Sequence, residues 1–164
     1  RCNMKYLTFL FLLSTACGPK QSKEARKSGQ NYQVSAPDGA WVRVKPGGAD
    51  KAWFNRDMSA TIYFDSNCKE RFEDGTLSDL LTHLTFGMAQ NEPVREESMT
   101  LDGRDALLRV YDGLLDGVQV RVGALVTKKN MCLYDGLYIA PPARFEDGWG
   151  SFVQVVTGFR TRGN

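Results

Sequence analysis

Apolar and polar residues alternate along much of the chain, which is the pattern of β-strands that bury one face. The clearest run extends from Val118 to Val126, where every second residue is apolar. The last run stops at Pro141-Pro142, because proline cannot donate a hydrogen bond to a neighbouring strand. The same pattern predicts further strands at residues 40–45, 60–64, 106–111 and 132–139.

Asp-Gly dipeptides punctuate these runs. Both residues of the dipeptide tolerate a positive φ, which two-residue hairpin turns require, so Asp-Gly between alternating runs is a strong hairpin signal. Strands that are joined by such tight turns pair antiparallel. The dipeptides begin at positions 38, 74, 102, 112, 116, 135 and 147.

A first helix is predicted between the two groups of strands, over residues 77–88. Four leucines and Met88 fall on one face at the helical period, and Thr76 or Ser78 could cap the first turn. The helix therefore has one apolar side with which to cover the sheet.

A second helix is predicted near the end of the chain, with an aromatic stripe along one side. Such a stripe suits a cofactor site or a membrane-docking face, but it is more often the side that packs on a sheet. Gly148 and Gly150 weaken the first turn, so we expect the helix to start near Trp149. The stripe consists of Phe145, Trp149, Phe152, Val156 and Phe159.

A further strand is predicted around Glu96 and Glu97, so the order of elements is strands, a helix, four strands and a final helix. This order predicts an α+β fold in which an antiparallel sheet is covered by two helices. Residues 37–164 have the length of a single domain with one core.

The segment before this domain has the layout of a cleaved export signal. Lys5 precedes a short apolar run, and small residues lead to Cys17. The apolar run is shorter than the roughly 18 residues that a spanning helix needs. With Cys17, the segment resembles the lipobox of bacterial lipoproteins, whose cysteine is diacylated and becomes the mature N-terminus, although Ser14 stands where Leu is usual. We expect residues 1–3 to be an upstream extension and residues 4–16 the lipoprotein signal peptide; a plain secretory signal is the alternative.

Residues 17–36 are expected to form a lipidated basic tether. They contain too few apolar residues to fold alone. Their four basic residues could each add roughly 1 kcal/mol of attraction to an anionic bilayer, or could simply be solvated. From Asp38 onward the chain has 15 basic and 18 acidic residues, and this mildly acidic balance argues against nucleic-acid binding. The basic residues of the tether are Lys20, Lys23, Arg26 and Lys27.

The domain resembles the PsbP-like, or DcrB-like, α/β/α sandwich of small envelope lipoproteins over residues 38–160. The matching features are Trp41 in the first strand, Leu101–Ala106 (LDGRDA) at a hairpin, Tyr134-Asp135 in the last strand and Phe152–Phe159 in the final helix. Members of this superfamily include proteins without known catalysis, several of them accessory factors of larger assemblies. The resemblance therefore implies a binding or assembly role, and a cystatin-like or NTF-like α+β cone is the alternative architecture.

The sequence offers little catalytic chemistry. His83 is the only histidine, and Asp79 four residues earlier could form a base dyad with it on a helix, although a surface histidine is the ordinary reading. No G-x-S-x-G, H-E-x-x-H or P-loop motif is present. We therefore expect no enzyme, no cofactor and no metal site. Two weaker ideas are calcium binding by the turn aspartates 102, 105, 112 and 116, and an anion-binding face formed by Arg43, Arg109 and Arg121.

Cys68 and Cys132 are the cysteines of the exported domain, and an oxidising compartment favours a disulfide between them. Closing a loop of about 65 residues could contribute roughly 4 kcal/mol to stability. Two buried free thiols are the alternative. A metal site is disfavoured because only His83 could add a nitrogen ligand.

Together these features predict a membrane-anchored envelope lipoprotein that acts as a non-enzymatic accessory or scaffold module. Gly18, rather than Asp, follows Cys17, which in the enteric lipoproteins that the segment resembles favours the periplasmic face of the outer membrane. Phe86, Trp53 and Phe54 are the expected contacts for an envelope protein partner. The alternatives are a carrier of a small or lipidic ligand between sheet and helix and, more weakly, a hydrolase that uses Asp79 and His83.

Overall fold

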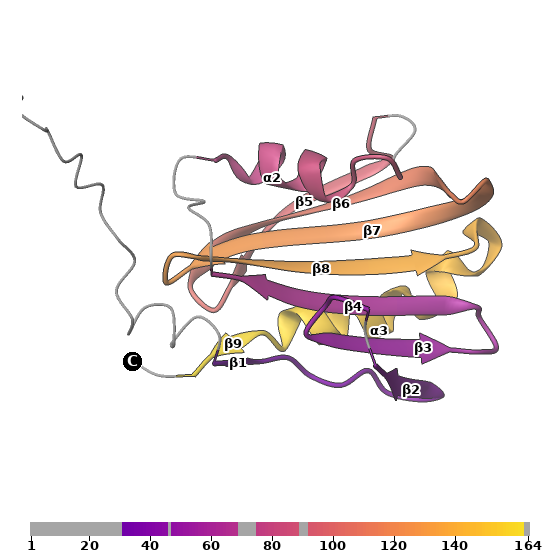
Figure 1. Cartoon of the computed structure of the whole chain (residues 1–164), viewed down its shortest axis with the longest axis horizontal. Coiled ribbons are helices and arrows are strands. Elements are labelled where there is room, and N and C mark those ends of the chain that lie inside the picture. The colour runs from indigo at the N-terminus through magenta and orange to yellow at the C-terminus, as the bar shows by residue number, and fades with distance from the viewer. Residues whose placement is uncertain (1–30, 46, 69–74, 89–91, 163–164) are drawn as a thin grey trace, which may run out of the picture.

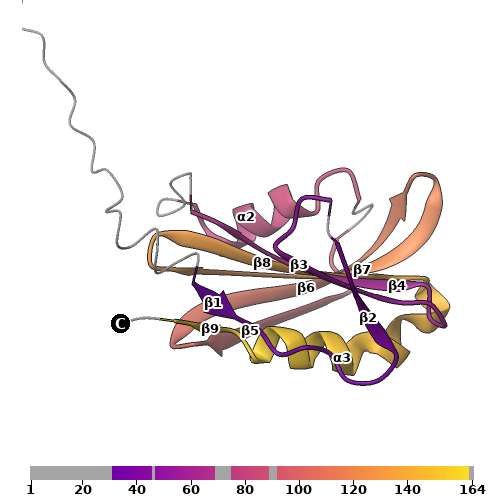
Figure 2. The same ribbon diagram turned by 60° about the horizontal axis from the view of Figure 1, so that its bottom comes forward.

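Seven antiparallel strands form one sheet with a helix on each face (Figures 1 and 2). The computed structural model describes residues 31–45, 47–68, 75–88 and 92–162. Along the sheet the strands follow the order β2-β3-β4-β8-β7-β6-β5, and every neighbouring pair is antiparallel. The strands are β2 (Trp41–Val44), β3 (Lys51–Asn55), β4 (Ala60–Asn67), β5 (Arg95–Leu101), β6 (Arg104–Leu115), β7 (Val118–Lys129) and β8 (Cys132–Ala140).

The two helices lie on opposite faces of this sheet. Helix α2 (Leu77–Leu84) contacts β6 and β7. Helix α3 (Phe145–Thr157) follows the short 3₁₀ turn η1 (Pro142–Arg144) and contacts β8 and β4 on the other face (Figure 2). This arrangement confirms the predicted α+β class with an antiparallel sheet and two covering helices. Among the described residues, no helix is long and apolar enough to cross a bilayer.

Two of the Asp-Gly dipeptides form the predicted hairpin turns. Asp102-Gly103 joins β5 to β6 with φ values of 49° and 75°, and Asp116-Gly117 joins β6 to β7 with φ values of 50° and 80°. Positive φ at both central residues matches the right-handed twist of the flanking strands. A third two-residue turn, Asn130-Met131, also has positive φ at both positions and joins β7 to β8.

Three other Asp-Gly dipeptides lie inside regular elements, so they are not turns. They begin at Asp112 in β6, Asp135 in β8 and Asp147 in α3. Two of their glycines bring helix and sheet close together. A Cβ on Gly136 would lie 3.1 Å from Val156 Cγ1, and one on Gly148 would overlap the Tyr138 hydroxyl. Here glycine supplies space rather than a positive φ.

The aromatic stripe of α3 is a core surface. Phe145, Phe152, Val156 and Phe159 are fully buried against the sheet, and Phe159 lies just after the helix ends. The helix begins at Phe145 and not near Trp149 as expected, because Gly148 is needed where α3 crosses Tyr138. Tertiary packing outweighs the low helix propensity of glycine there.

Helix α2 is shorter than predicted. Thr76 caps its N-terminus by accepting a hydrogen bond from the Asp79 amide at 3.0 Å. The helix ends at Leu84, and Gly87 adopts a φ of 82°. The expected extension to Met88 is therefore wrong, because the chain turns away toward β5.

The domain also includes residues that the composition assigns to the tether. Strand β1 (Tyr32–Gln33) pairs with β9 (Arg160–Thr161) in a second, two-stranded sheet. The Tyr32 ring contacts Phe64, Tyr134 and Phe159 in the core. An aromatic residue within a polar segment thus ties the beginning of the described chain to its end (Figure 1).

The expected disulfide between Cys68 and Cys132 is present in the structure. Asn67 at the end of β4 pairs with Leu133 near the start of β8, so the two cysteines lie next to this pair. Both are buried. The bond joins neighbouring strands across 64 positions of sequence.

Candidate interaction surface

One half of the sheet has a face over which α2 does not extend. Residues directly opposite each other on paired antiparallel strands share a face, so the register shows which side chains lie there. Ala124 packs beneath α2. The residues paired with it in successive strands extend across the sheet to the edge strand β2. One row contains Ala124, Leu137, Tyr63, Ala52 and Val44, and the next contains Val122, Ile139, Thr61, Phe54 and Val42.

This face becomes more exposed with distance from α2. At the far edge Val42, Val44 and Phe54 are exposed, and 65 % of Val42 is accessible. Half-buried side chains of β4 and β8 fill the space in between. Single exposed apolar residues are common, but a contiguous group marks a contact surface. We call this group the open sheet face; it consists of Val42, Val44, Phe54, Tyr63, Leu137 and Ile139.

Trp53 and Phe54 point to opposite faces of β3, and only Phe54 belongs to the open sheet face. Trp53 is 6 % exposed and lies in the core on the side of α3. Trp41 and Met58 pack against the same core. The expectation that Trp53 contacts a partner is therefore wrong, whereas Phe54 has the exposure that a contact needs.

Phe86 is a second exposed aromatic residue, with 88 % of its surface accessible. It lies in the turn after α2 and not on the helix, beside a cleft of about 510 Å³. One wall of this cleft is polar, since Arg109 donates to Glu96 at 2.5 Å and to Ser78 at 2.9 Å. Phe86 thus remains a candidate partner contact. It follows α2 and does not belong to the strands that form the open sheet face.

His83 and Asp79 do not form the dyad that their spacing allows. His83 Nδ1 lies 3.0 Å from the backbone carbonyl oxygen of Asp79, not from its carboxylate. The Asp79 carboxylate instead accepts a hydrogen bond from Thr76 Oγ1 at 2.7 Å, as part of the helix cap. Both side chains are exposed. This geometry gives the hydrolase hypothesis no oriented base.

The strand arginines do not form one anion-binding face. Arg121 makes two hydrogen bonds to Asp112, at 2.7 and 3.2 Å, on the α3 side of the sheet, whereas Arg109 lies on the α2 side with Ser78. The turn aspartates are likewise spread along β6, because Asp102 precedes the strand and Asp112 lies near its other end. Within the described residues, no group of three or more acidic, histidine or cysteine side chains could hold a metal ion.

Asp102 is an anchor of the fold. Its carboxylate accepts hydrogen bonds from Lys129 Nζ at 2.7 Å and from the Thr161 amide and hydroxyl at 2.8 and 2.9 Å. Burial by itself raises the pKa of Asp102, but these hydrogen bonds outweigh it and lower the pKa to about 2. The side chain therefore ties the β5–β6 turn to β7 and β9.

Asp65 of β4, Asp135 of β8 and Asp50, which directly precedes β3, form a row of three aspartates. Asp65 lies directly opposite Asp135, and the Asp50 amide donates to Asp65 Oδ1 at 3.0 Å. Burial raises the pKa of Asp135 to about 7, and the charges of Asp65 and Asp50 add to the effect. Burial also raises the pKa of Asp65. Only the strand register brings these residues together, so the sequence contains no signal for the row.

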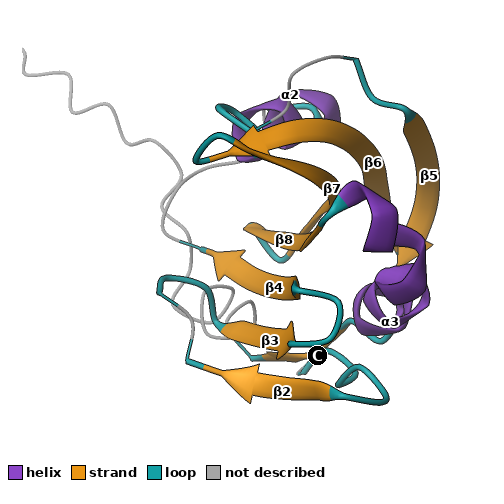
Figure 3. Cartoon of the chain, turned by 90° about the vertical axis from the view of Figure 1, so that its right-hand side faces the viewer, coloured by secondary structure: helices purple, strands orange, loops and turns teal. Residues whose placement is uncertain are grey.

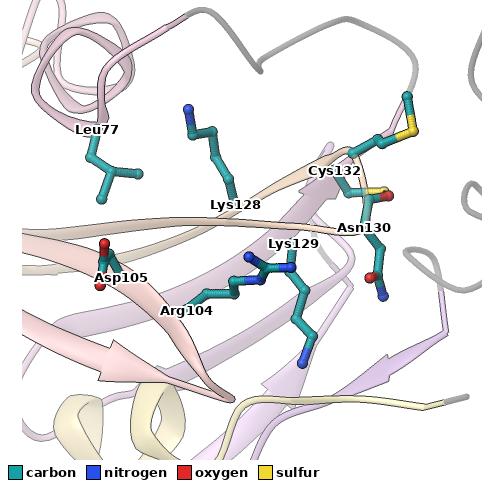
Figure 4. A pocket seen from close by; sticks show the side chains of 8 residues that line it. Leu77, Arg104, Asp105, Lys128, Lys129, Asn130 and Cys132 are labelled. Atoms are coloured by element: carbon teal, nitrogen blue, oxygen red, sulfur yellow. The ribbon is translucent and has the colours of Figure 1, made fainter. Parts of the chain in front are cut away.

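A pocket of about 490 Å³ beside the β7–β8 turn is lined by three basic residues and by the Asn130–Cys132 segment, among others (Figure 4). Lys128 and Lys129 extend to opposite sides of β7, as the strand period requires. Lys128 Nζ donates to the Gly75 carbonyl at 2.6 Å, and Lys129 binds Asp102. Both lysines therefore form hydrogen bonds to neighbouring segments of the chain. Arg104, which also lines the pocket, has an exposed side chain.

Comparison with solved structures identifies the architecture. The cyanobacterial PsbP (CyanoP) of Synechocystis sp. PCC 6803 matches with a TM-score of 0.57 and 19 % identity, over 82 % of this chain and 88 % of that chain. The chain has a PsbP-like fold. LpqN of Mycobacterium tuberculosis, described as involved in cell envelope biogenesis, matches with a TM-score of 0.58 and 11 % identity, over 78 % of this chain and 81 % of that chain. A Pseudomonas aeruginosa protein of unknown function matches with a TM-score of 0.52 and 11 % identity, over 79 % and 87 % of the two chains. No family model and no curated protein sequence matches this chain.

The space between α3 and the sheet of this PsbP-like domain is filled. Tyr138 stacks on Phe152 with ring centroids 5.8 Å apart, and Trp149 lies 5.5 Å from Phe152. A Cβ on Gly123 would lie 2.7 Å from the Trp149 ring. The carrier hypothesis places its ligand between sheet and helix, and the packed interface under α3 does not favour a ligand on that face of the sheet.

The N-terminal features lie outside the described residues. They are the upstream extension, the signal peptide, Cys17 and most of the tether. Lipidation and membrane attachment therefore stay predictions from the sequence.

Proposed function

We propose that this protein is a lipid-anchored envelope lipoprotein whose PsbP-like domain is a non-enzymatic accessory module that binds a protein partner. The open sheet face carries the proposal. At its outer edge, away from α2, the exposed residues Val42, Val44 and Phe54 form an apolar group. Faces of this kind are stable in water only at modest size and gain from being covered.

The location part of the proposal rests on the N-terminal segment. An apolar run followed by small residues and Cys17 supports export and acylation, and Gly18 supports the periplasmic face of the outer membrane. The description of the structural neighbour LpqN, involved in cell envelope biogenesis, agrees with an envelope role. Anchoring by Cys17 would hold the open sheet face within reach of other envelope proteins.

We assign no catalytic residue, because the best candidate pair, His83 and Asp79, does not have the geometry of a base dyad. His83 contacts a backbone carbonyl, and the Asp79 carboxylate is used by the cap of α2. A general base must be oriented toward a substrate by its partner group. We therefore assign the module a binding role and no reaction.

Site-specific photocrosslinking in the native envelope tests the proposal. A photoreactive amino acid is placed at Phe54 on the open sheet face and, as a matched control, at Val118, which is also an exposed apolar strand residue. We expect discrete protein adducts from position 54 and none of these from position 118. Identical adducts from both positions, or none from position 54, would contradict the proposal.

A further inference from the structure

We propose that β2 is the docking site for an extended segment of the partner, which adds a strand to the sheet and alternates apolar with acidic residues. This inference rests on the proposed function and specifies the chemistry of the partner. It follows from three properties of β2: its position in the sheet, the different character of its two faces, and the sign of the charge on one of them.

Strand β2 is an edge of the seven-stranded sheet. On one side it pairs with β3 from Trp41 to Val44. On its other side no strand of the described chain is paired with it, and Figure 3 shows β2 as the lower rim of the curved sheet. The backbone N–H and C=O groups of such an edge are a template for another strand, and extended peptides bind in this way in several recognition domains.

The two faces of β2 select different side chains. Val42 and Val44 point to the open sheet face, where Phe54 continues the apolar surface. Arg43 is exposed and lies opposite Trp53, on the other face. Because side chains alternate along a strand, an added strand would place apolar residues beside the valines and its remaining residues beside Arg43.

The face that carries Arg43 is positively charged at this edge. Exposed Lys45 follows β2 directly, and Lys51 lies at the start of β3. Burial lowers the pKa of Lys51, Asp50 opposes this effect, and the positive charge of Arg43 lowers the pKa further. Acidic side chains on an added strand would relieve the repulsion between these cations.

The opposite edge of the sheet, β5, differs from β2 in the distribution of its charges. Strand β5 exposes charges of both signs, and Arg95 forms an ion pair with Glu146 of α3 at 2.9 Å. Mixed charges along an edge are a common means of preventing strand addition. The β5 edge thus carries charges of both signs, whereas the charges at the β2 edge, Arg43 and Lys45, are both positive and one face of β2 is apolar.

Charge also argues against the two other occupants that the chain itself could supply. Residues 17–30 of the tether carry its four basic residues and would meet Arg43 and Lys45 with like charge. Antiparallel pairing of two copies centred on Arg43 would place two guanidinium groups opposite each other, which is destabilising. A partner segment with acidic residues has neither problem.

Peptide binding to the purified full-length protein tests the inference by fluorescence anisotropy. The first probe is a labelled decapeptide that alternates valine and glutamate, and the second has lysine in place of every glutamate. A third probe is the glutamate peptide with alternate backbone nitrogens methylated, which removes donors that a new strand needs. We expect the glutamate peptide to bind, and both other peptides to bind about tenfold more weakly or not at all.

Variants of the edge then locate the binding. Arg43→Glu is expected to reverse the preference, so that the lysine peptide binds more tightly than the glutamate peptide, and Arg43→Gln to reduce the difference. Val42→Asp is expected to weaken binding about tenfold. Val118→Asp is the matched control, since Val42 and Val118 are 65 % and 64 % exposed, and it should leave binding unchanged. Circular dichroism of each variant checks that the domain is folded.

Several results would overturn the inference. The glutamate peptide could fail to bind, or the lysine peptide or the methylated peptide could bind as tightly as the glutamate peptide. Val118→Asp could weaken binding as much as Val42→Asp does. Sedimentation could show a dimer of the protein that Val42→Asp dissociates. If the glutamate peptide fails while photocrosslinking at position 54 still yields a partner, strand addition is wrong and the proposed function stands. If the peptide binds as expected while no adduct forms in the envelope, the edge site stands and the proposed function is wrong.

Discussion

Tyr138 and Gly148 are in direct contact where α3 crosses β8. The Tyr138 hydroxyl donates to the Phe145 carbonyl at 2.8 Å, and a Cβ on Gly148 would overlap that hydroxyl. This glycine therefore allows a buried tyrosine to satisfy its polar group while its ring packs against Phe145 and Phe152. The close approach fixes the position of α3 and leaves the opposite face to α2.

We predict that Gly148→Ala destabilises the domain by about 1–3 kcal/mol, although alanine favours helices by about 1 kcal/mol over glycine. Gly150→Ala is the control within the same helix, because nothing lies within 4 Å of its added Cβ. That variant should gain up to about 1 kcal/mol. Urea denaturation of both variants measures the difference, and equal effects of the two substitutions would contradict the role given to Gly148.

Asp102 is expected to stabilise the fold in a pH-dependent way. Its pKa is about 2 in the folded protein, below the ordinary value of 3.8, so its contribution to stability is present above pH 4 and is lost as the pH falls from about 4 to 2. Asp102→Asn should keep the turn and cost about 2 kcal/mol at pH 7, with a smaller difference from the native protein at pH 2–3. Thermal unfolding across this pH range is the measurement. Asp116→Asn, at the same position of the other hairpin, serves as the control and should show no such loss.

Asp135 is expected to have the opposite effect. Its pKa is about 7 in the folded protein, above the ordinary value of 3.8, so the unfolded chain loses its proton first and stability falls as the pH rises from about 4 to 7. Asp135→Asn should therefore stabilise the protein above pH 7 by at most a few kcal/mol and have little effect near pH 4.

The neighbouring aspartate provides the control for this prediction. Removing the charge of Asp65 with Asp65→Asn should lower the pKa of Asp135 and reduce the pH dependence. A pKa of Asp135 near 4, measured by carbon-detected NMR titration, would contradict the prediction.

Much of this fold could be predicted from the alternation of residues. The strands around Ile62, Leu108 and Val122 follow from period two, and the turns at Asp102 and Asp116 follow from the need for positive φ. The same Asp-Gly signal failed at Asp135, because Gly136 serves the close approach of α3. A dipeptide cannot show whether its glycine is needed for backbone conformation or for space.

The interaction surface was less predictable, because it depends on which parts of each face are covered. Period two placed Trp53 and Phe54 on opposite faces, but it could not show that the core covers Trp53 and that α2 stops short of Phe54. Likewise, the row of Asp65 and Asp135 exists only through the register of β4 and β8. Such relationships between distant strands are set by tertiary pairing and leave no local pattern.

The disulfide between Cys68 and Cys132 is expected to contribute strongly to stability. It closes a loop across 64 positions, and the chain-entropy model gives roughly 4 kcal/mol for a loop of this size. Replacing both cysteines by alanine should lower the urea midpoint without changing the far-ultraviolet spectrum in the absence of urea. Thiol labelling of the denatured, unreduced native protein provides an independent check, and two reactive cysteines from the domain would show that the bond does not form.

Membrane attachment is expected to depend on Cys17. An acylated cysteine adds buried CH₂ groups at about 0.8 kcal/mol each, and two chains give stable anchoring where one does not. Cys17→Ser should therefore stop processing or release the protein from the membrane fraction, while the folded domain keeps its thermal stability. Substituting Lys20, Lys23, Arg26 and Lys27 by glutamine is the control for electrostatic attraction, and it should weaken attachment far less than loss of the lipid. Unchanged mass and unchanged fractionation of Cys17→Ser would show that Cys17 is not acylated.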